Sequence, residues 1–111
     1  MRLWREESFG PVKAIIRVHS EEEALAVAND SEYGLSAAVY SRDSARAWNV
    51  AQRLQTGICH INGPTVHDEA QMPFGGCKAS GYGRFGGRAG IAEFTELRWI
   101  TIQTQPRELP F

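Results

Sequence analysis

Between residues 12 and 62 the chain alternates between stretches typical of strands and stretches typical of helices, and this order limits the folds open to it. In residues 12–18 every second position is apolar, as in a strand with one buried face: Val12, Ala14, Ile16 and Val18. Residues 35–40 are small and apolar, as in a strand covered on both faces. Residues 58–62 favour a third strand, bounded by Gly63 and Pro64.

Two helices are expected between these strands. Ser20 with Glu23 three residues later forms a capping box, so a helix should begin there and end in the turn-prone residues 29–31. Asp43 or Ser44 can cap the second helix, which Gly57 is expected to end. Its apolar positions follow a helical spacing: Ala47, Val50, Ala51 and Leu54.

The connections between the three expected strands are too long for hairpins and long enough for crossover helices. They predict an α/β fold with a parallel β-α-β-α-β unit and right-handed connections. A chain of 111 residues has room for one domain. At this size roughly two thirds of the unfolded surface should be buried, enough for a modest core.

The character of the chain changes after this unit, because seven of its 11 glycines lie between residues 75 and 90. This stretch is expected to be a loop, followed by a short helix through Ile91, Phe94 and Leu97. Residues 98–103 are rich in β-favouring side chains and predict a late strand. No neighbouring segment of the sequence is expected to pair with that strand, so its backbone N–H and C=O groups would stay unpaired. Another chain is therefore expected to cover it.

Composition excludes several classes of function. The formal net charge of -1 gives no electrostatic reason to expect nucleic acid or an anionic membrane as a partner. No apolar run reaches the ~18 residues of a membrane span, and the first residues lack a signal peptide's apolar core. We therefore expect a cytoplasmic protein in which Cys59 and Cys77 are free thiols.

Residues 81–86 spell G-x-G-x-x-G, which in dinucleotide-binding folds lets backbone amides approach a pyrophosphate. That motif should follow a strand directly, yet the nearest expected strand ends at Asn62, with two prolines in between. A structural glycine-rich turn accounts for it better than a phosphate site.

The residues Cys59, His60 and Cys77 show no metal-ligand spacing, so no metal site is expected. To act as a nucleophile, Cys59 would need His60 or His67 as a general base. The favoured interpretation is that Cys59 is a small buried side chain. The polar residues 67–69 fit either an exposed turn or the rim of a pocket.

Four separate blocks of this sequence together resemble the aldehyde dehydrogenase superfamily in order and spacing. The first two are EESFGPV at 6–12 and ANDSEYGLSAAV at 28–39. The third is PFGG at 73–76 followed by K at 78, SG at 80–81 and GR at 83–84, and the fourth is EFTE at 93–96. The match spans almost the whole chain but corresponds to the C-terminal part of that family. Residues 57–69 and 97–102 resemble the branch that oxidises aromatic aldehydes such as salicylaldehyde, vanillin and benzaldehyde.

The resemblance implies roles for particular residues. Glu7 matches the glutamate that binds the nicotinamide ribose, and Phe9 matches the aromatic residue beside the nicotinamide. Phe74 matches an aromatic wall of the aldehyde pocket. The loop that shapes the pocket entrance would contain Thr65, Val66 and His67. Residues 99–102 match the strand that joins subunits, which implies a homo-oligomer.

The same resemblance shows what this chain does not match. In the family, a cysteine and a glutamate from upstream blocks attack the aldehyde and activate water, while hydride passes to NAD or NADP. Neither block is present, so no catalytic residue is expected here. Glu7 and Phe9 alone would leave most of a dinucleotide in water, so tight NAD(P) binding is not expected.

The sequence thus predicts the C-terminal part of an NAD(P)-dependent aldehyde dehydrogenase, inactive alone. Residues 1–97 would belong to the catalytic domain, and residues 98–111 would form an interface strand and tail. The partner would be a second copy or the missing upstream part of the enzyme. The alternative is an α/β module that self-associates or binds a partner without catalysis.

Overall fold

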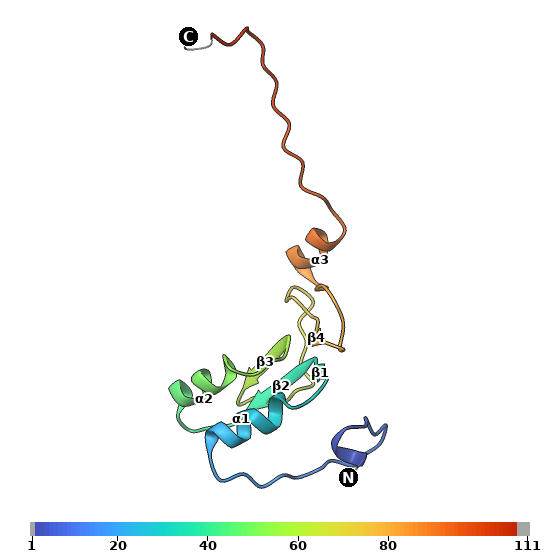
Figure 1. The fold of residues 1–111 in the computed structure, drawn as a ribbon, viewed down its shortest axis with the longest axis vertical. Coiled ribbons are helices and arrows are strands. Elements are labelled where there is room, and N and C mark those ends of the chain that lie inside the picture. The colour runs from blue at the N-terminus through green and yellow to red at the C-terminus, as the bar shows by residue number, and fades with distance from the viewer. Residues whose placement is uncertain (1, 109–111) are drawn as a thin grey trace.

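The computed structural model describes residues 2–108 and has an α/β fold with two small sheets (Figure 1). Its elements in chain order are η1 (Arg2–Trp4), α1 (Glu21–Asn29), β1 (Tyr33–Gly34), β2 (Ser36–Val39), α2 (Ser44–Ala51), β3 (Ile58–Ile61), β4 (Cys77–Lys78) and α3 (Gly87–Glu93). We call residues 20–93 the body, residues 2–19 the N-terminal arm and residues 94–108 the C-terminal arm. Within residues 2–108, no helix has the length and apolar character needed to cross a bilayer.

β2 and β3 form the parallel pair that the sequence predicts. Ser36 lies opposite Ile58 and Val39 opposite Ile61, with α2 as the connection packed against both strands. At the end of β3, Asn62 has a φ of 56°, and its side chain bonds the backbone N–H and C=O of Ser41 at 2.9 and 3.0 Å. This amide holds the carboxyl ends of the two strands together.

A second pair, β1 with β4, is antiparallel and was not expected from the sequence. Tyr33 pairs with Lys78 and Gly34 with Cys77, and the Ser80 hydroxyl accepts a bond from the Gly34 N–H at 2.9 Å. The expectation that residues 75–90 are all loop is therefore wrong. Strands of two residues are too short to show a hydrophobic period, which is why the pattern did not reveal them.

The expected starts of the two central helices are confirmed. Ser20 caps α1 by accepting from the Glu23 N–H at 3.1 Å, and Asp43 caps α2 by accepting from the Arg46 N–H at 3.0 Å. α2 ends at Ala51, however, so Gly57 is not its stop. A Cβ at Gly57 would lie 1.9 Å from the Gly75 carbonyl oxygen, so this glycine permits a close backbone approach instead.

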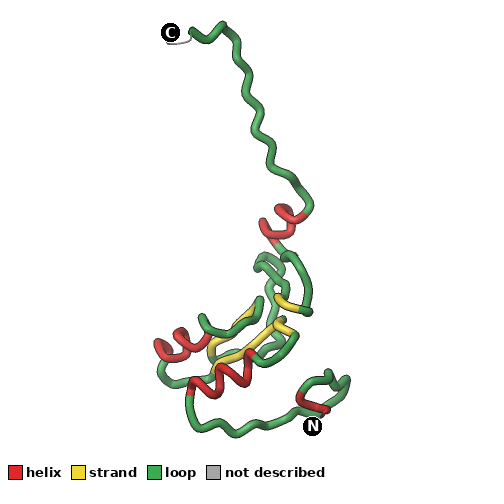
Figure 2. Tube along the Cα trace, viewed as in Figure 1, coloured by secondary structure: helices red, strands yellow, loops and turns green. Residues whose placement is uncertain are grey.

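Residues 12–18 and 98–103 are extended but form no β-strand, contrary to the expectation (Figure 2). A strand exists only when a neighbouring strand satisfies its backbone, and within residues 2–108 none lies beside either segment. The first strand of the expected five-element unit is therefore not formed. α3 also ends at Glu93, which leaves Leu97 in the extended C-terminal arm.

The core is much smaller than expected, because among the described residues only Leu25 and Ala47 are buried apolar side chains. The accessible surface is 9938 Å², whereas a compact monomer of this mass exposes about 6100 Å². The radius of gyration of 21.4 Å likewise exceeds the roughly 13 Å of a compact domain. The expected burial of two thirds of the surface is therefore wrong.

Candidate functional site

The start of β3 and the loop after it enclose a hollow of about 370 Å³, which we call the β3 hollow. Its volume lies within the range of small-molecule sites. It is lined by Gly57, Ile58, Cys59, His60, His67, Asp68, Glu69, Met72, Pro73 and Phe74. The set combines aromatic and aliphatic walls with a few polar groups, which is the composition of a site for a small, mostly apolar ligand.

Two histidines meet at this hollow. The rings of His60 and His67 are 5.4 Å apart between centroids and nearly perpendicular. His67 Nε2 lies 3.3 Å from a Glu69 carboxylate oxygen, which orients its ring. His60 Nε2 is buried and has no hydrogen-bond partner within residues 2–108.

Phe74 is held in the wall of the hollow by its backbone. Its N–H donates to the Phe85 carbonyl at 2.9 Å, and the Phe85 N–H donates back to the Phe74 carbonyl at 2.7 Å. Phe85 sits in the G-x-G-x-x-G stretch, where Gly81, Gly83 and Gly86 all have positive φ. These glycines shape a turn that positions Phe74, as expected of a structural motif.

The two cysteines lie in different surroundings. Burial raises the pKa of the Cys59 thiol, which favours the unreactive protonated form. The Cys77 thiol donates to the Gln55 carbonyl oxygen at 3.1 Å. Both thiols are free, and within the described part of the chain no three metal-ligating side chains come together.

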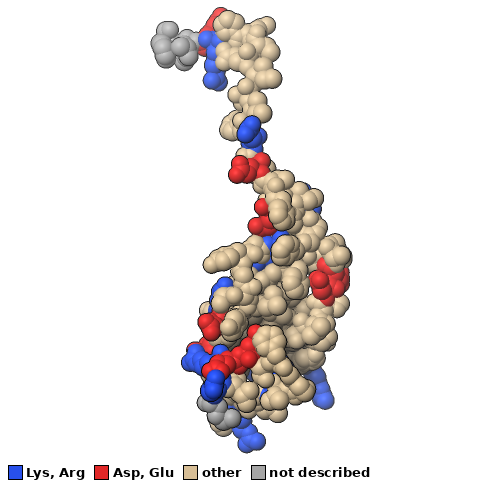
Figure 3. All heavy atoms as spheres, turned by 90° about the vertical axis from the view of Figure 1, so that its right-hand side faces the viewer, with Lys and Arg blue, Asp and Glu red and all other residues tan. Residues whose placement is uncertain are grey.

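A larger hollow of about 720 Å³ lies between the N-terminal arm and the body, and we call it the arm hollow. Glu7 lines it together with Trp4, Arg5 and Lys13 from the arm, and the body contributes Tyr33 and Ser80. Phe9 lies outside, with 94% of its surface exposed. Figure 3 shows acidic and basic groups side by side over the body, without an extended surface of one sign.

The residues that the resemblance singles out therefore lie in different places: some in the β3 hollow, one in the arm hollow and others in neither. His67 and Phe74 share the β3 hollow, while Glu7 lies in the arm hollow. Thr65 and Val66 line neither: the Thr65 carbonyl accepts a bond from the Ser36 hydroxyl at 3.0 Å, and Val66 is 91% exposed.

Sequence reasoning did not place His60 and Met72 at this site. The signal for His60 was available, because a polar ring in the otherwise apolar stretch of residues 58–61 needs a special environment. Met72 gave no such signal.

Comparison with known proteins agrees with this picture. Residues 1–100 match the model of the aldehyde dehydrogenase family. A vanillin dehydrogenase from Pseudomonas fluorescens is 66% identical over 110 residues, which are 99% of this chain and 23% of that protein. A salicylaldehyde dehydrogenase from Pseudomonas putida is 52% identical over 111 residues, again 23% of its length. The chain belongs to the aldehyde dehydrogenase family and spans less than a quarter of the length of these relatives.

Solved structures give the same result. A salicylaldehyde dehydrogenase from Pseudomonas putida G7, complexed with salicylaldehyde, superposes with a TM-score of 0.92 and 53% identity over all of this chain and 23% of that one. An aldehyde dehydrogenase from Mycobacterium tuberculosis complexed with NAD+ gives 0.78 and 43% over 83% of this chain and 19% of that one. The superposition on the salicylaldehyde dehydrogenase therefore includes both arms of this chain.

Proposed function

We propose that this chain supplies part of the substrate pocket, a cofactor contact and a subunit contact of an NAD(P)-dependent enzyme that oxidises aromatic aldehydes to acids. The β3 hollow carries the proposal, because it joins the aromatic ring of Phe74 and the His67 loop into one mostly apolar site. An aromatic aldehyde is a flat apolar ring with polar substituents, and this lining suits it. The named relatives act on vanillin and salicylaldehyde, which supports this substrate class.

The cofactor contact is proposed for Glu7 and Phe9. The carboxylate of Glu7 accepts hydrogen bonds only, which fits the two hydroxyl donors of a nicotinamide ribose. Phe9 is exposed and free to pack against a planar ring. When bound, NAD(P) would accept the hydride of the aldehyde. These two side chains touch a small fraction of a dinucleotide, so the chain alone should bind it weakly.

Catalysis itself is proposed to need groups from the rest of the enzyme. The raised pKa of Cys59 makes it a poor nucleophile, and Cys77 is engaged with backbone carbonyls. We therefore expect the 111-residue chain alone to oxidise no aldehyde. Turnover that Cys59→Ala or Cys77→Ala abolishes would contradict this.

The C-terminal arm is proposed to form the subunit contact, as an interface strand following a catalytic-domain part at residues 1–97. Trp99, Ile100 and Ile102 are largely exposed on an extended, unpaired backbone. Such a segment gains both apolar burial and hydrogen bonds by joining a sheet of another subunit. Residues 109–111 of the expected 98–111 tail lie outside the described residues.

This observation also favours the second candidate function, a self-associating module without catalysis. Light scattering of the 111-residue chain tests the association: we expect a dimer or larger, and a monomer for Ile102→Lys. A monomer at high concentration for the unchanged chain would contradict it.

The substrate proposal is tested in a hybrid enzyme. The matching 111 residues of the Pseudomonas putida salicylaldehyde dehydrogenase are replaced by this chain, and NADH formation is followed with vanillin, salicylaldehyde and acetaldehyde. In the hybrid, Phe74→Ala should raise the KM of the aromatic aldehydes by about tenfold, because an aromatic wall contributes up to roughly 1.5 kcal/mol. The KM of acetaldehyde should change little.

Tyr82→Ala is the matched control, because Tyr82 is an exposed aromatic residue of the body and lies outside the β3 hollow. An inactive hybrid, or equal effects of the two substitutions on the KM of aromatic aldehydes, would contradict the proposal.

A further inference from the structure

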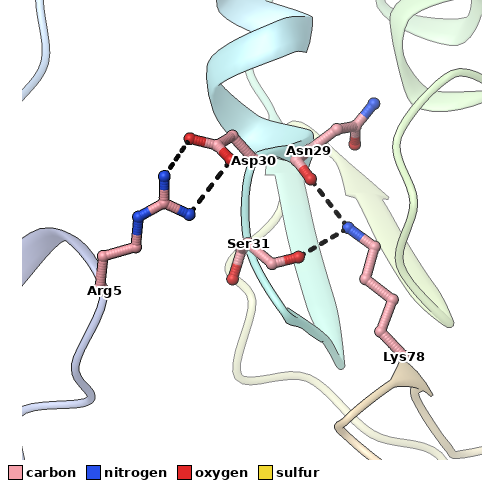
Figure 4. A network of polar contacts seen from close by, with 5 residues as sticks. All are labelled: Arg5, Asn29, Asp30, Ser31 and Lys78. Atoms are coloured by element: carbon pink, nitrogen blue, oxygen red, sulfur yellow. Dashed lines mark hydrogen bonds and ion pairs between the residues drawn. The ribbon is translucent and has the colours of Figure 1, made fainter.

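The turn that ends α1, residues 29–31, is contacted by two distant segments, and we call it the α1 junction. Figure 4 shows Arg5 of the N-terminal arm on one side of this turn and Lys78 of β4 on the other. The Arg5 guanidinium reaches both carboxylate oxygens of Asp30, at 3.2 and 3.0 Å. Lys78 Nζ donates to the carbonyl oxygens of Asn29 and Ser31 at 2.9 and 3.0 Å.

Each contact suits the chemistry of a helix C-terminus. The last carbonyl groups of a helix lack intrahelical donors and carry partial negative charge, so an ammonium group is a favourable partner for them. Lys78 has a φ of 55°, a conformation that few side chains adopt, and its pairing with Tyr33 helps to hold it there. The fork of Arg5 matches the Asp30 carboxylate in a bidentate pair, which fixes direction as well as distance.

Hydrogen bonds join the N-terminal arm to the body at two places. At its end, the His19 N–H donates to Glu23 Oε2 at 2.8 Å. Within residues 2–108, the two bonds from Arg5 to Asp30 are the hydrogen bonds that join residues 2–18 to the body. Arg5 stands two residues before Glu7, and both side chains line the arm hollow. Arg5 is therefore the hydrogen-bonded anchor of the segment that contains Glu7.

The segment from Phe74 to Lys78 is held by the other contact of the junction, that of Lys78. Lys78 follows Phe74 by four residues, and the Gly76 carbonyl between them is held by Arg84 Nη1 at 2.8 Å. The bonds from Lys78 Nζ fix the end of this loop to α1. One turn of the chain thus anchors the segment of Glu7 and the segment of Phe74.

We propose that the α1 junction sets the cofactor contact and the aldehyde wall at a fixed separation, with Arg5 and Lys78 as positioning residues. This inference rests on the proposed function, in which Glu7 contacts the cofactor and Phe74 the aldehyde. Hydride transfer needs its two partners in near contact and aligned, so a shared anchor for both segments serves the reaction directly.

The first test is kinetic and uses the hybrid enzyme. Arg5→Ala and Asp30→Ala should each raise the KM of the nicotinamide cofactor by about threefold, the effect of one partly exposed bidentate pair. The KM of aldehyde should stay constant, and the double variant should be no worse than either single variant. The reversed pair, Arg5→Asp with Asp30→Arg, should recover most of the loss, which a merely structural role for each residue would not produce.

Lys78 gives the complementary result. Lys78→Met keeps the length of the side chain but removes its donors, so it should raise the KM of aromatic aldehydes more than that of cofactor. Arg2→Ala is the control for the arm, because Arg2 pairs with Glu6 inside the arm and is almost fully exposed. It should leave both KM values unchanged.

A second readout needs no cofactor and uses the 111-residue chain. In ¹⁵N relaxation measurements, the order parameters of the amides of residues 5–10 should fall below about 0.6 in Arg5→Ala and in Asp30→Ala. They should recover in the reversed pair and stay unchanged in Arg2→Ala. Unchanged order in Arg5→Ala would overturn the junction even if Lys78→Met failed to fold.

Glu7→Gln in the hybrid separates the two proposals. If it raises the KM of cofactor while Arg5→Ala does not, the cofactor role of Glu7 stands and the junction is overturned. If neither substitution changes the KM of cofactor, the role of Glu7 is wrong and the junction as stated falls with it.

Discussion

The body and the two arms are both rich in apolar side chains, yet only the body buries any of them within residues 2–108. In the body, Leu25 retains 4% of its exposed surface and Ala47 none. In the arms, Ile15 is 98% exposed and Trp99 90%. The difference lies in where the stabilising partners are. The caps and ion pairs of the body join residues of the body to one another, whereas no strand within residues 2–108 lies beside either arm.

The excess of exposed surface over that of a compact monomer has a physical meaning. Large apolar surface in contact with water is unfavourable, and extended arms bring additional unpaired backbone groups. Both features are relieved together when another polypeptide covers the arms. The arms are therefore the segments where contacts outside this chain should matter, and the body is where substitutions should show their full effect on its own stability.

The largest expected effect is that of Gly57→Ala. A Cβ at this position would lie 1.9 Å from the Gly75 carbonyl oxygen and 2.8 Å from its carbon, which are backbone atoms that cannot turn away. We expect the free energy of unfolding to fall by about 3 kcal/mol or more, measured by urea denaturation. Gly10→Ala in the arm has nothing within 4 Å of the new Cβ and should be neutral. Equal losses of unfolding free energy for the two substitutions would contradict the conclusion that the body is packed and the arm is not.

Leu25→Ala should have the next largest effect, because it removes one of the few buried side chains of the body. A loss of about 2–3 kcal/mol is expected, at the lower end of the range for buried leucines because the core is small. Leu97→Ala in the C-terminal arm is the matched control and should change the unfolding free energy by less than about 0.5 kcal/mol. A comparable loss at Leu97 would show that the arm packs in solution.

These contrasts also explain what the sequence was able to predict. The caps at Ser20 and Asp43 act within three residues, so their motifs identify the helix starts correctly. Residues 12–18 alternate as a strand would, but within residues 2–108 no strand lies beside them, so the pattern alone did not produce a strand. Gly57 was interpreted as a helix stop because its contact with Gly75 is 18 positions away along the chain and leaves no local signal.

The candidate site divides in the same way. Phe74, which the resemblance singles out, lines the β3 hollow and is held there by backbone bonds to Phe85 in the glycine-rich stretch. The positions of Thr65 and Val66 depend on how the loop folds back against β2. No periodicity encodes that contact, so the place of these two residues relative to the β3 hollow could not be read from the sequence.

Ser20→Ala tests a local signal directly. Losing the hydroxyl that accepts from the Glu23 N–H should cost about 1 kcal/mol of stability, typical of an N-cap. Circular dichroism during urea denaturation measures it. Ser8→Ala in the N-terminal arm is the matched control, since no cap depends on it, and it should leave the midpoint unchanged. A null effect at Ser20 would mean that α1 is held by its packing alone.

The smallest expected effect concerns the ion pair of Glu22 with Arg53, which joins α1 to the residues after α2. Arg53 Nη1 lies 2.7 Å from a Glu22 carboxylate oxygen. This hydrogen bond, with the positive charge of Arg53, lowers the pKa of Glu22 below its ordinary value of 4.5. Because the pKa is lowered in the folded state, the pair stabilises the body above the unfolded pKa, and that contribution is lost as the pH falls through the lowered value.

Carboxyl ¹³C chemical shifts followed from pH 7 to pH 2 measure this pKa directly. Arg53→Ala should return the pKa of Glu22 toward 4.5, whereas Arg42→Ala, an exposed arginine on the same body, should leave it lowered. In Glu22→Gln no carboxylate titrates at this position, so the free energy of unfolding should fall less steeply as the pH is lowered. Since Glu22 is largely exposed, high salt should weaken the shift. A Glu22 pKa that Arg53→Ala does not raise would show that Arg53 is not the cause of the lowered value.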